Sequence, residues 1–195
     1  LQLRQLSFAA RQFLHLSTGG DGDAPAAQFP LFDCDSVQLR PGVRLHERLG
    51  HHRVQVGGRA LSANVLEGAQ ASIFVAIESD DDGGDRVTYY AQLILCFSAV
   101  YLSEARQLCY VRWLHTAPAV AKELKRPLTP SEKRGPFEVY RWAIYPPGRA
   151  GHPVRGGPWY GVVSVRSVMH RVHMVESMHE TGLYRLNTDV WLEHL

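Results

Sequence analysis

The segment VTYYAQLILCF at residues 87–97, followed by QLCYVRWL at residues 107–114, decides the fold. Both runs are rich in β-branched and aromatic residues, and a more polar stretch separates them. This pattern predicts the two strands of an antiparallel hairpin. Because successive side chains of a strand point to opposite faces, the second run divides into two rows. One row holds Leu108, Tyr110, Arg112 and Leu114, and the other holds Cys109, Val111, Trp113 and His115.

Further short strands are predicted on both sides of this hairpin. Apolar and polar residues alternate at 37–45 and 54–56, and Gly57-Gly58 follows where a tight turn is expected. Other apolar runs bounded by turn residues occur at 72–78, 137–145, 159–165, 169–174 and 184–191. Many short strands with little helix are typical of a sandwich or a barrel, and we favour a barrel because closure removes exposed edge strands. The predicted fold class is therefore mainly β: a curved antiparallel β-barrel with short helices and an N-terminal helix.

The beginning of the chain has a different pattern. Apolar residues at 1–16 are spaced as in an amphipathic helix, and a link rich in Gly and Asp continues to about Gln28. We therefore expect two parts, a helix with its linker at 1–28 and a barrel domain at 29–195. The helix either docks on the barrel or contacts a neighbour outside this chain. A short helix with proline in its first turn is predicted at 118–126.

The composition is that of an ordinary soluble globular protein, with 45% hydrophobic and 21% charged residues among 195. No run of about 18 apolar residues occurs, so we expect no membrane-spanning segment. The chain begins with Leu1, and we expect it to be one domain of something larger. Its cysteines, Cys34, Cys96 and Cys109, lack the spacing of a disulfide or zinc framework, so we expect free thiols in a reducing compartment.

A basic insert, rich in Pro and Gly, is expected within the barrel domain at about 117–158. Residues 122–155 hold eight Lys or Arg against three Glu, a local charge of +5 in a chain whose net charge is +2. Such an asymmetry indicates either a surface that faces a polyanion or a solvated loop. If the insert binds nucleic acid (DNA), the residues expected to contact it are Lys122, Lys125, Arg126, Lys133, Arg134, Arg149 and Arg155.

Motifs for catalysis and for nucleotide binding are absent from the sequence. No phosphate loop, dinucleotide fingerprint or nucleophile elbow occurs. His170 and His173 would point to opposite faces of a strand, so they do not make a pair of metal ligands. We therefore predict no catalytic residue, no metal and no cofactor. An enzyme whose site residues are scattered along the chain is the less supported alternative.

Aromatic residues are concentrated in the second half of the chain. Most aromatic side chains of a barrel fill its core. Two or three can instead line a surface pocket, where a methylated ammonium group binds by cation–π attraction. The residues concerned are Tyr89, Tyr90, Tyr110, Trp113, Trp142, Tyr145, Trp159 and Tyr160.

Four segments resemble the BAH (bromo-adjacent homology) domain in their order and spacing. They are YYAQLI at 89–94, CYVRWL at 109–114, FEVY at 137–140 and VVSVRSVMHRVHMV at 162–175. The resemblance covers about residues 72–175. It implies a nuclear, chromatin-associated binding module that recognises a protein or a histone-tail peptide. DNA binding through the basic insert is the alternative function.

The peptide-binding residues that this resemblance implies are Tyr89, Trp113 and His115. His115 stands where relatives that bind methyl-lysine often carry another aromatic residue, and the basic insert replaces a His-x-Asp motif that is usual in BAH domains. A second resemblance, to a β-domain of transposon-encoded (KDZ-type) proteins, extends from Ser72 to Asn187. It transfers no activity to this chain.

Overall fold

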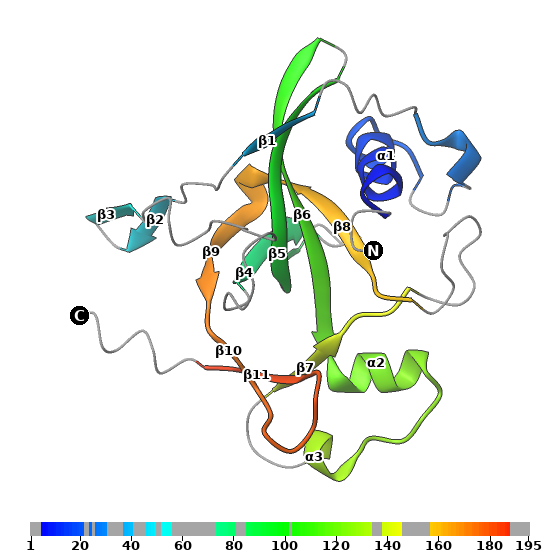
Figure 1. Ribbon diagram of the computed structural model, residues 1–195, viewed down its shortest axis with the longest axis vertical. Helices are drawn as coiled ribbons and strands as arrows, with labels where there is room; N and C mark the ends of the chain where they lie inside the picture. The colour runs from blue at the N-terminus through cyan, green and yellow to red at the C-terminus, as the bar shows by residue number, and fades with distance from the viewer. Residues whose placement is uncertain are drawn as a thin grey trace.

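The computed structural model describes residues 5–21, 24, 26–30, 37–40, 46–49, 52–55, 73–80, 85–101, 103–133, 138–145 and 157–187. An antiparallel sheet built around one long hairpin forms its centre (Figure 1). The strands are β1 (Gln38–Arg40), β2 (His46–Leu49), β3 (His52–Gln55), β4 (Phe74–Asp80), β5 (Arg86–Tyr101), β6 (Glu104–Thr116), β7 (Val139–Trp142), β8 (Tyr160–Ser164), β9 (Val168–Val172), β10 (Met174–Glu176) and β11 (Leu183–Leu186). The helices are α1 (Leu6–Ser17), α2 (Ala117–Glu123) and α3 (Pro130–Lys133), and single 3-10 turns are η2 (Ala26–Gln28) and η4 (Val165–Ser167).

Hydrogen bonding orders the main sheet as β10-β11-β7-β6-β5-β4-β9, with β1 beside β5 and β8 beside β6. Its pairs are antiparallel, and β2 and β3 form a separate small sheet. The predicted mainly β, antiparallel class is therefore confirmed. The pairing leaves β10 and β9 at the two ends of the sheet, so it is not closed and the predicted barrel is not shown.

The long hairpin of β5 and β6 contains both runs from which the fold was predicted. Its pairing extends from Tyr90 opposite Leu114 to Tyr101 opposite Glu104, and the register shifts between Leu93 and Leu95. Such a bulge bends a strand and increases its twist. Both strands continue beyond their predicted ends, and the tip of the hairpin projects past the other strands of the main sheet (Figure 1).

Both faces of this hairpin are buried, because different elements cover each one. The cluster on the first face consists of Val75, Ile77, Ala91, Leu93, Cys96, Cys109, Val111 and Val168. The cluster on the second face consists of Ala9, Ala10, Ile94, Phe97, Ala99, Leu108, Tyr110, Tyr160 and Val162. The two rows predicted for β6 are thus separated as expected. Burial of both rows gives the hairpin its almost continuous apolar sequence.

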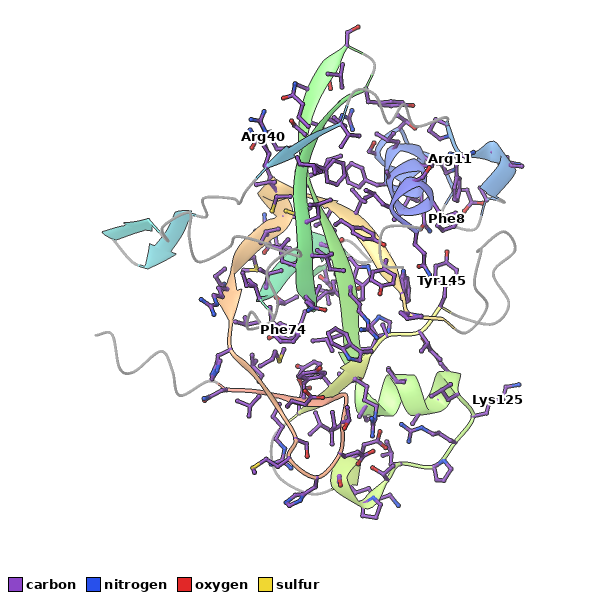
Figure 2. The ribbon with its side chains drawn as sticks, in the orientation of Figure 1. Phe8, Arg11, Arg40, Phe74, Lys125 and Tyr145 are labelled. Carbon is purple, nitrogen blue, oxygen red and sulfur yellow. The ribbon has the colours of Figure 1, made fainter. Side chains whose placement is uncertain are left out.

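Helix α1 docks on the sheet, which decides between the two alternatives left by the sequence. Its buried residues are Ala9, Ala10 and Leu14, and it packs beside β8. The Arg11 guanidinium donates hydrogen bonds to the carbonyl oxygens of Phe29 (2.8 Å) and Pro30 (2.9 Å), which ties the following segment to the helix. Figure 2 shows α1 above Tyr145. The domain boundary predicted near residue 28 stays a prediction.

The helix predicted at 118–126 is present as α2 and ends in a Schellman motif. Backbone N–H groups of Lys125 and Arg126 donate to the carbonyl oxygens of Lys122 (3.1 Å) and Ala121 (3.0 Å). Lys125 has φ of 51°, the left-handed conformation that this motif needs at its turning residue. The chain therefore reverses sharply at Lys125, whose side chain points away from the sheet (Figure 2).

A capping box opens α3. The Thr129 hydroxyl accepts from the Glu132 N–H (3.3 Å), and the Glu132 carboxylate accepts from the Thr129 N–H (2.7 Å). These two bonds satisfy donors that a helix start leaves unpaired. The Glu132 side chain is therefore held by the Thr129 backbone, independently of any tertiary contact.

The tight turn predicted at Gly57-Gly58 lies outside the described residues. The small sheet pairs His46 with Gln55 and Leu49 with His52. Within the described ranges, no helix has the length and hydrophobicity that crossing a membrane requires.

Candidate ligand-binding pocket

A pocket of about 410 Å³ lies between α1 and the sheet. Its walls include all three residues predicted to bind a peptide, Tyr89 of β5 and Trp113 and His115 of β6. Trp159, which directly precedes β8, adds a fourth ring. All four side chains are half-buried, so they are neither closed into the core nor fully in solvent.

Strand register brings the first three rings together. Ala91 lies opposite Trp113, and Tyr90 lies opposite Leu114, which places Tyr89 across from His115. Residues directly opposite each other project from the same face of a sheet. The face predicted for Trp113 and His115 therefore also carries Tyr89.

Backbone hydrogen bonds bring in Trp159 from a distant part of the sequence. The Trp113 N–H donates to the Trp159 carbonyl oxygen (3.0 Å), and the Trp159 N–H donates to the Ala143 carbonyl oxygen (2.9 Å). Ala143 in turn donates its N–H to the carbonyl oxygen of Trp113 (2.9 Å). Both tryptophans are thus anchored through main chain, leaving their rings available to line the pocket.

The rings meet edge to face. Tyr89 and Trp113 have centroids 6.2 Å apart at 72°, and His115 and Trp159 have centroids 5.2 Å apart at 68°. Trp159 also contacts Tyr145 at 5.4 Å and 63°. Edge-to-face contact leaves one ring face of a pair open, and the face of an aromatic ring is its electronegative side.

Gly161 has no side chain, and the Trp113 ring occupies the space that a side chain there would need. A Cβ atom at Gly161 would lie 2.4 Å from Nε1 of Trp113, too close for the indole to keep its place. Val111, on β6, is the cross-strand partner of Gly161, so the glycine lies within the paired part of β8. A glycine there weakens the strand but permits close approach of another group.

The described lining of the pocket carries a single charged side chain. Among the described residues that line it, Glu78 is the only Asp, Glu, Lys or Arg. Glu78 pairs with Arg86 at 3.5 Å, and their side chains are 38% and 76% exposed. An ion pair this exposed contributes little to stability and exchanges readily.

His115 adds a polar but uncharged group. Burial lowers the pKa of His115 below its ordinary value of 6.5, so the imidazole is mostly neutral at pH 7. Its Nδ1 lies 3.9 Å from Oε1 of Glu123, whose pKa burial raises. Oε2 of Glu123 is buried and has no hydrogen-bond partner among the described residues.

Helix α1 supplies the apolar end of the pocket. Ala9, Phe13 and Leu16 line it, together with Gln12. Leu16 is 46% exposed, whereas Ala9 on the same helix is buried. The pocket is therefore lined both by the aromatic group and by apolar residues of α1.

The residues predicted to contact nucleic acid are not gathered in this pocket. Lys122, Lys125 and Lys133 are exposed, and no salt bridge to a described carboxylate involves them. Arg134, Arg149 and Arg155 lie outside the described residues. Arg126 is half-buried and already paired with Glu132.

Glu132 is the centre of an ion-pair network that joins α3 to the rest of the fold. Its carboxylate accepts hydrogen bonds from Nη1 and Nη2 of Arg126 at 2.8 and 2.6 Å, and from Nε of Arg141 on β7. Arg141 also contacts Glu180, in the loop between β10 and β11. The Arg126 guanidinium, followed by the Thr129 N–H and Arg141, holds the pKa of Glu132 well below its usual range. Arg126 thus has a structural partner, and its predicted contact with nucleic acid stays a prediction.

Across the described ranges, no group of three or more His, Cys, Asp or Glu side chains is placed to hold a metal ion.

Comparisons with known protein families, with curated proteins and with solved structures each found no match to this chain. The resemblances to BAH and KDZ-type domains therefore stay predictions.

Sequence reasoning missed three features of the pocket: the wall formed by α1, the seat at Gly161 and the carboxylate of Glu78. It counted Trp159 among the aromatic residues but did not place it beside Trp113. No local pattern reports these contacts, because each depends on segments distant in sequence. The one available signal was Trp-Tyr-Gly at 159–161, where a glycine follows two large rings inside a predicted strand.

Proposed function

We propose that this chain is a protein-recognition module whose aromatic pocket binds a cationic side chain. The partner we propose is a histone tail or a similar basic peptide carrying methylated lysine, which makes the module chromatin-associated and nuclear. The observation that carries the proposal is the grouping of Tyr89, Trp113 and Trp159 around one half-open pocket.

Electrostatics favours an organic cation in that pocket. Aromatic faces attract ammonium groups by about 0.5 to 2 kcal/mol for each contact, and more when water is excluded. Glu78 adds a carboxylate at the wall, and neutral His115 adds no opposing charge at pH 7. Methylation makes an ammonium group larger and harder to hydrate, so an aromatic site prefers the methylated form.

The structure of the sheet is compatible with a BAH-like barrel, which we propose as its architecture. β9 pairs with β4 and β10 pairs with β11, yet only His173 separates β9 from β10 in the chain. If β9 and β10 act as one bent strand, the chain itself joins the two ends of the sheet, and the sheet curls into a ring. A curled sheet presents the pocket on a rigid wall, which limits the entropy lost on binding.

The decisive experiment compares peptides that differ only in methylation. Histone-tail peptides with unmodified or trimethylated lysine are titrated into the protein by calorimetry. We expect the trimethylated peptide to bind more tightly, and Trp113→Ala to weaken that binding about tenfold or more through loss of one cation–π wall.

Tyr101→Ala is the matched control, because Tyr101 is a half-buried aromatic residue at the hairpin tip, outside the pocket. It should leave the affinity unchanged. Equal affinity for both peptides, or equal loss in the two variants, would rule out the proposed cation site.

The second candidate function is DNA binding by the basic insert, favoured by the exposed Lys122, Lys125 and Lys133. Binding to phosphates releases counterions, so the affinity should fall steeply with salt. Replacing the three lysines with alanine should reduce the slope of log K against log salt by about three. Fluorescence anisotropy with duplex DNA at several salt concentrations measures this slope.

A second triple variant, with three arginines replaced outside the insert, tests whether DNA binding depends on the insert or only on the net charge of the protein. Arg40, Arg171 and Arg185 are exposed residues of β1, β9 and β11, and replacing them removes the same charge. If DNA binds at the insert, this second variant keeps most of the original slope. An equal change in both variants, or no binding at low salt, would argue against a DNA site there.

A further inference from the structure

Two thiols face each other across the β5–β6 hairpin. Cys96 and Cys109 are direct cross-strand partners, and their Sγ atoms are 3.9 Å apart. Each residue is about 1% exposed, and both are free cysteines. No role in the proposed peptide or DNA site involves them.

We propose that Cys96 and Cys109 form an oxidation site, where a peroxide converts the two thiols into a disulfide that cross-links β5 to β6. In the resting protein the thiols stay reduced. The inference is independent of the proposed function, because it depends only on the geometry and chemistry of this pair.

Strand geometry permits the bond. Directly opposite residues of antiparallel strands have Cα atoms about 4.5 or 5.5 Å apart. A disulfide accommodates Cα separations of about 4.4 to 6.8 Å, so the backbone need not move. The sulfur atoms must approach from 3.9 Å to about 2.05 Å, which rotation about the two Cα–Cβ bonds can provide.

The two cysteines differ in reactivity. The hydrogen bond between the two thiols lowers the pKa of Cys96, whereas that same bond and burial raise the pKa of Cys109. Cys96 is therefore the thiol that attacks, since the thiolate is the nucleophile. Cys109 is in place to react with the product.

The reaction balances with one equivalent of hydrogen peroxide. The Cys96 sulfur attacks a peroxide oxygen and becomes a sulfenic acid, releasing the first water. The Cys109 sulfur then attacks the Cys96 sulfur and displaces its hydroxyl, which leaves as the second water with the Cys109 proton. Two thiols are oxidised to one disulfide, and the peroxide is reduced to two waters.

The pocket gives a small oxidant a route to the buried pair. Val163 on β8 lies directly opposite Cys109, and Val163 also lines the pocket. Ile77 belongs both to the pocket wall and to the apolar cluster that encloses the thiols. One layer of side chains thus separates the pocket from the cysteines, a distance that hydrogen peroxide, being small and uncharged, can cross by local fluctuations.

Peptide mapping of the oxidised protein tests the proposal. The chain is treated with hydrogen peroxide, unfolded, alkylated at its remaining thiols and digested. The peptides are then analysed by mass spectrometry. We expect a cross-linked peptide pair containing Cys96 and Cys109, lighter by two hydrogen atoms than the reduced pair, with Cys34 alkylated. The melting temperature should rise by several degrees, because the cross-link restricts the unfolded chain, and a dithiol reductant should reverse both changes.

Variants separate this bond from alternatives that use Cys34. Cys34→Ser should still form the cross-link, whereas Cys96→Ala and Cys109→Ala should each abolish it. Mapping of the wild-type protein decides the question even if an alanine variant fails to fold. Three alkylated thiols after oxidation, a disulfide that includes Cys34, or over-oxidised Cys96 without a cross-link would each overturn the proposal.

Discussion

Replacing Glu132 with glutamine is expected to lower the free energy of unfolding by about 3 kcal/mol, the lower end of the range for a broken buried ion pair. The substitution keeps the shape of the side chain but removes the charge that Arg126 and Arg141 share. We choose the lower end because the Arg126 side chain remains 28% exposed and can recover some hydration. Urea denaturation at pH 7 measures the difference.

The same variant has a defined pH signature. The folded-state pKa of Glu132 is lowered from its ordinary value of 4.5, mainly by the Arg126 hydrogen bond. A lowered pKa stabilises the folded state above the unfolded pKa, and this contribution is lost as the pH falls through the folded pKa. The difference between wild type and Glu132→Gln should therefore be largest near neutral pH and shrink steadily below about pH 4.

Glu104→Gln is the control for this experiment. Glu104 also pairs with an arginine, Arg106 at 3.4 Å, but its side chain is 73% exposed. Removing its charge should change stability by less than about 1 kcal/mol. If the two glutamine variants were equally stable, or if the pH dependence of wild type survived in Glu132→Gln, the Glu132 network would not have the stabilising role described above.

Replacing Gly161 with alanine is expected to lower the free energy of unfolding by about 2 kcal/mol, within the range for an overpacked site. The added methyl group would lie 2.4 Å from the Trp113 indole, which must move out of its seat. The displaced ring no longer faces Tyr89, so the proposed trimethyllysine peptide should also bind about tenfold more weakly.

A double-mutant cycle identifies the Trp113 ring as the cause. In a Trp113→Ala background the indole is gone, and Gly161→Ala should then cost little. Chemical denaturation of the four proteins gives the coupling energy between the two sites. If Gly161→Ala lowered the free energy of unfolding equally in both backgrounds, its cost would come from strand geometry and not from contact with Trp113.

Local pattern predicted the elements best where one segment was sufficient. The β5–β6 hairpin, α2 and α1 are present near their predicted positions. The sequence Thr129-Pro-Ser-Glu132 also carries a capping-box signature that could have located α3, because both of its hydrogen bonds lie within four residues. Such features depend on backbone preference and on the alternation of side chains, which are properties of a short stretch.

The pocket was predicted only in part, for a physical reason. Tyr89, Trp113 and His115 could be grouped because two adjacent strands and their register place them on one face. The position of Trp159 beside them could not be predicted, because hydrogen bonds to the distant residues 113 and 143 place it there. Arg126 was predicted to be one of the DNA-contacting cations of the basic insert. The net charge of a segment does not show which ions pair, so its partner Glu132 was not identified.

By itself, the sequence determined an antiparallel, mainly β protein with a long hairpin and an amphipathic helix. These follow from periodicity and turn chemistry, which act over a few residues. Only the tertiary structure decided that α1 docks to form one wall of an aromatic pocket, that Gly161 seats Trp113, and that Cys96 faces Cys109 in contact. Those outcomes depend on register and on packing between distant segments, where shifting one strand by a single residue would turn every side chain to the other face.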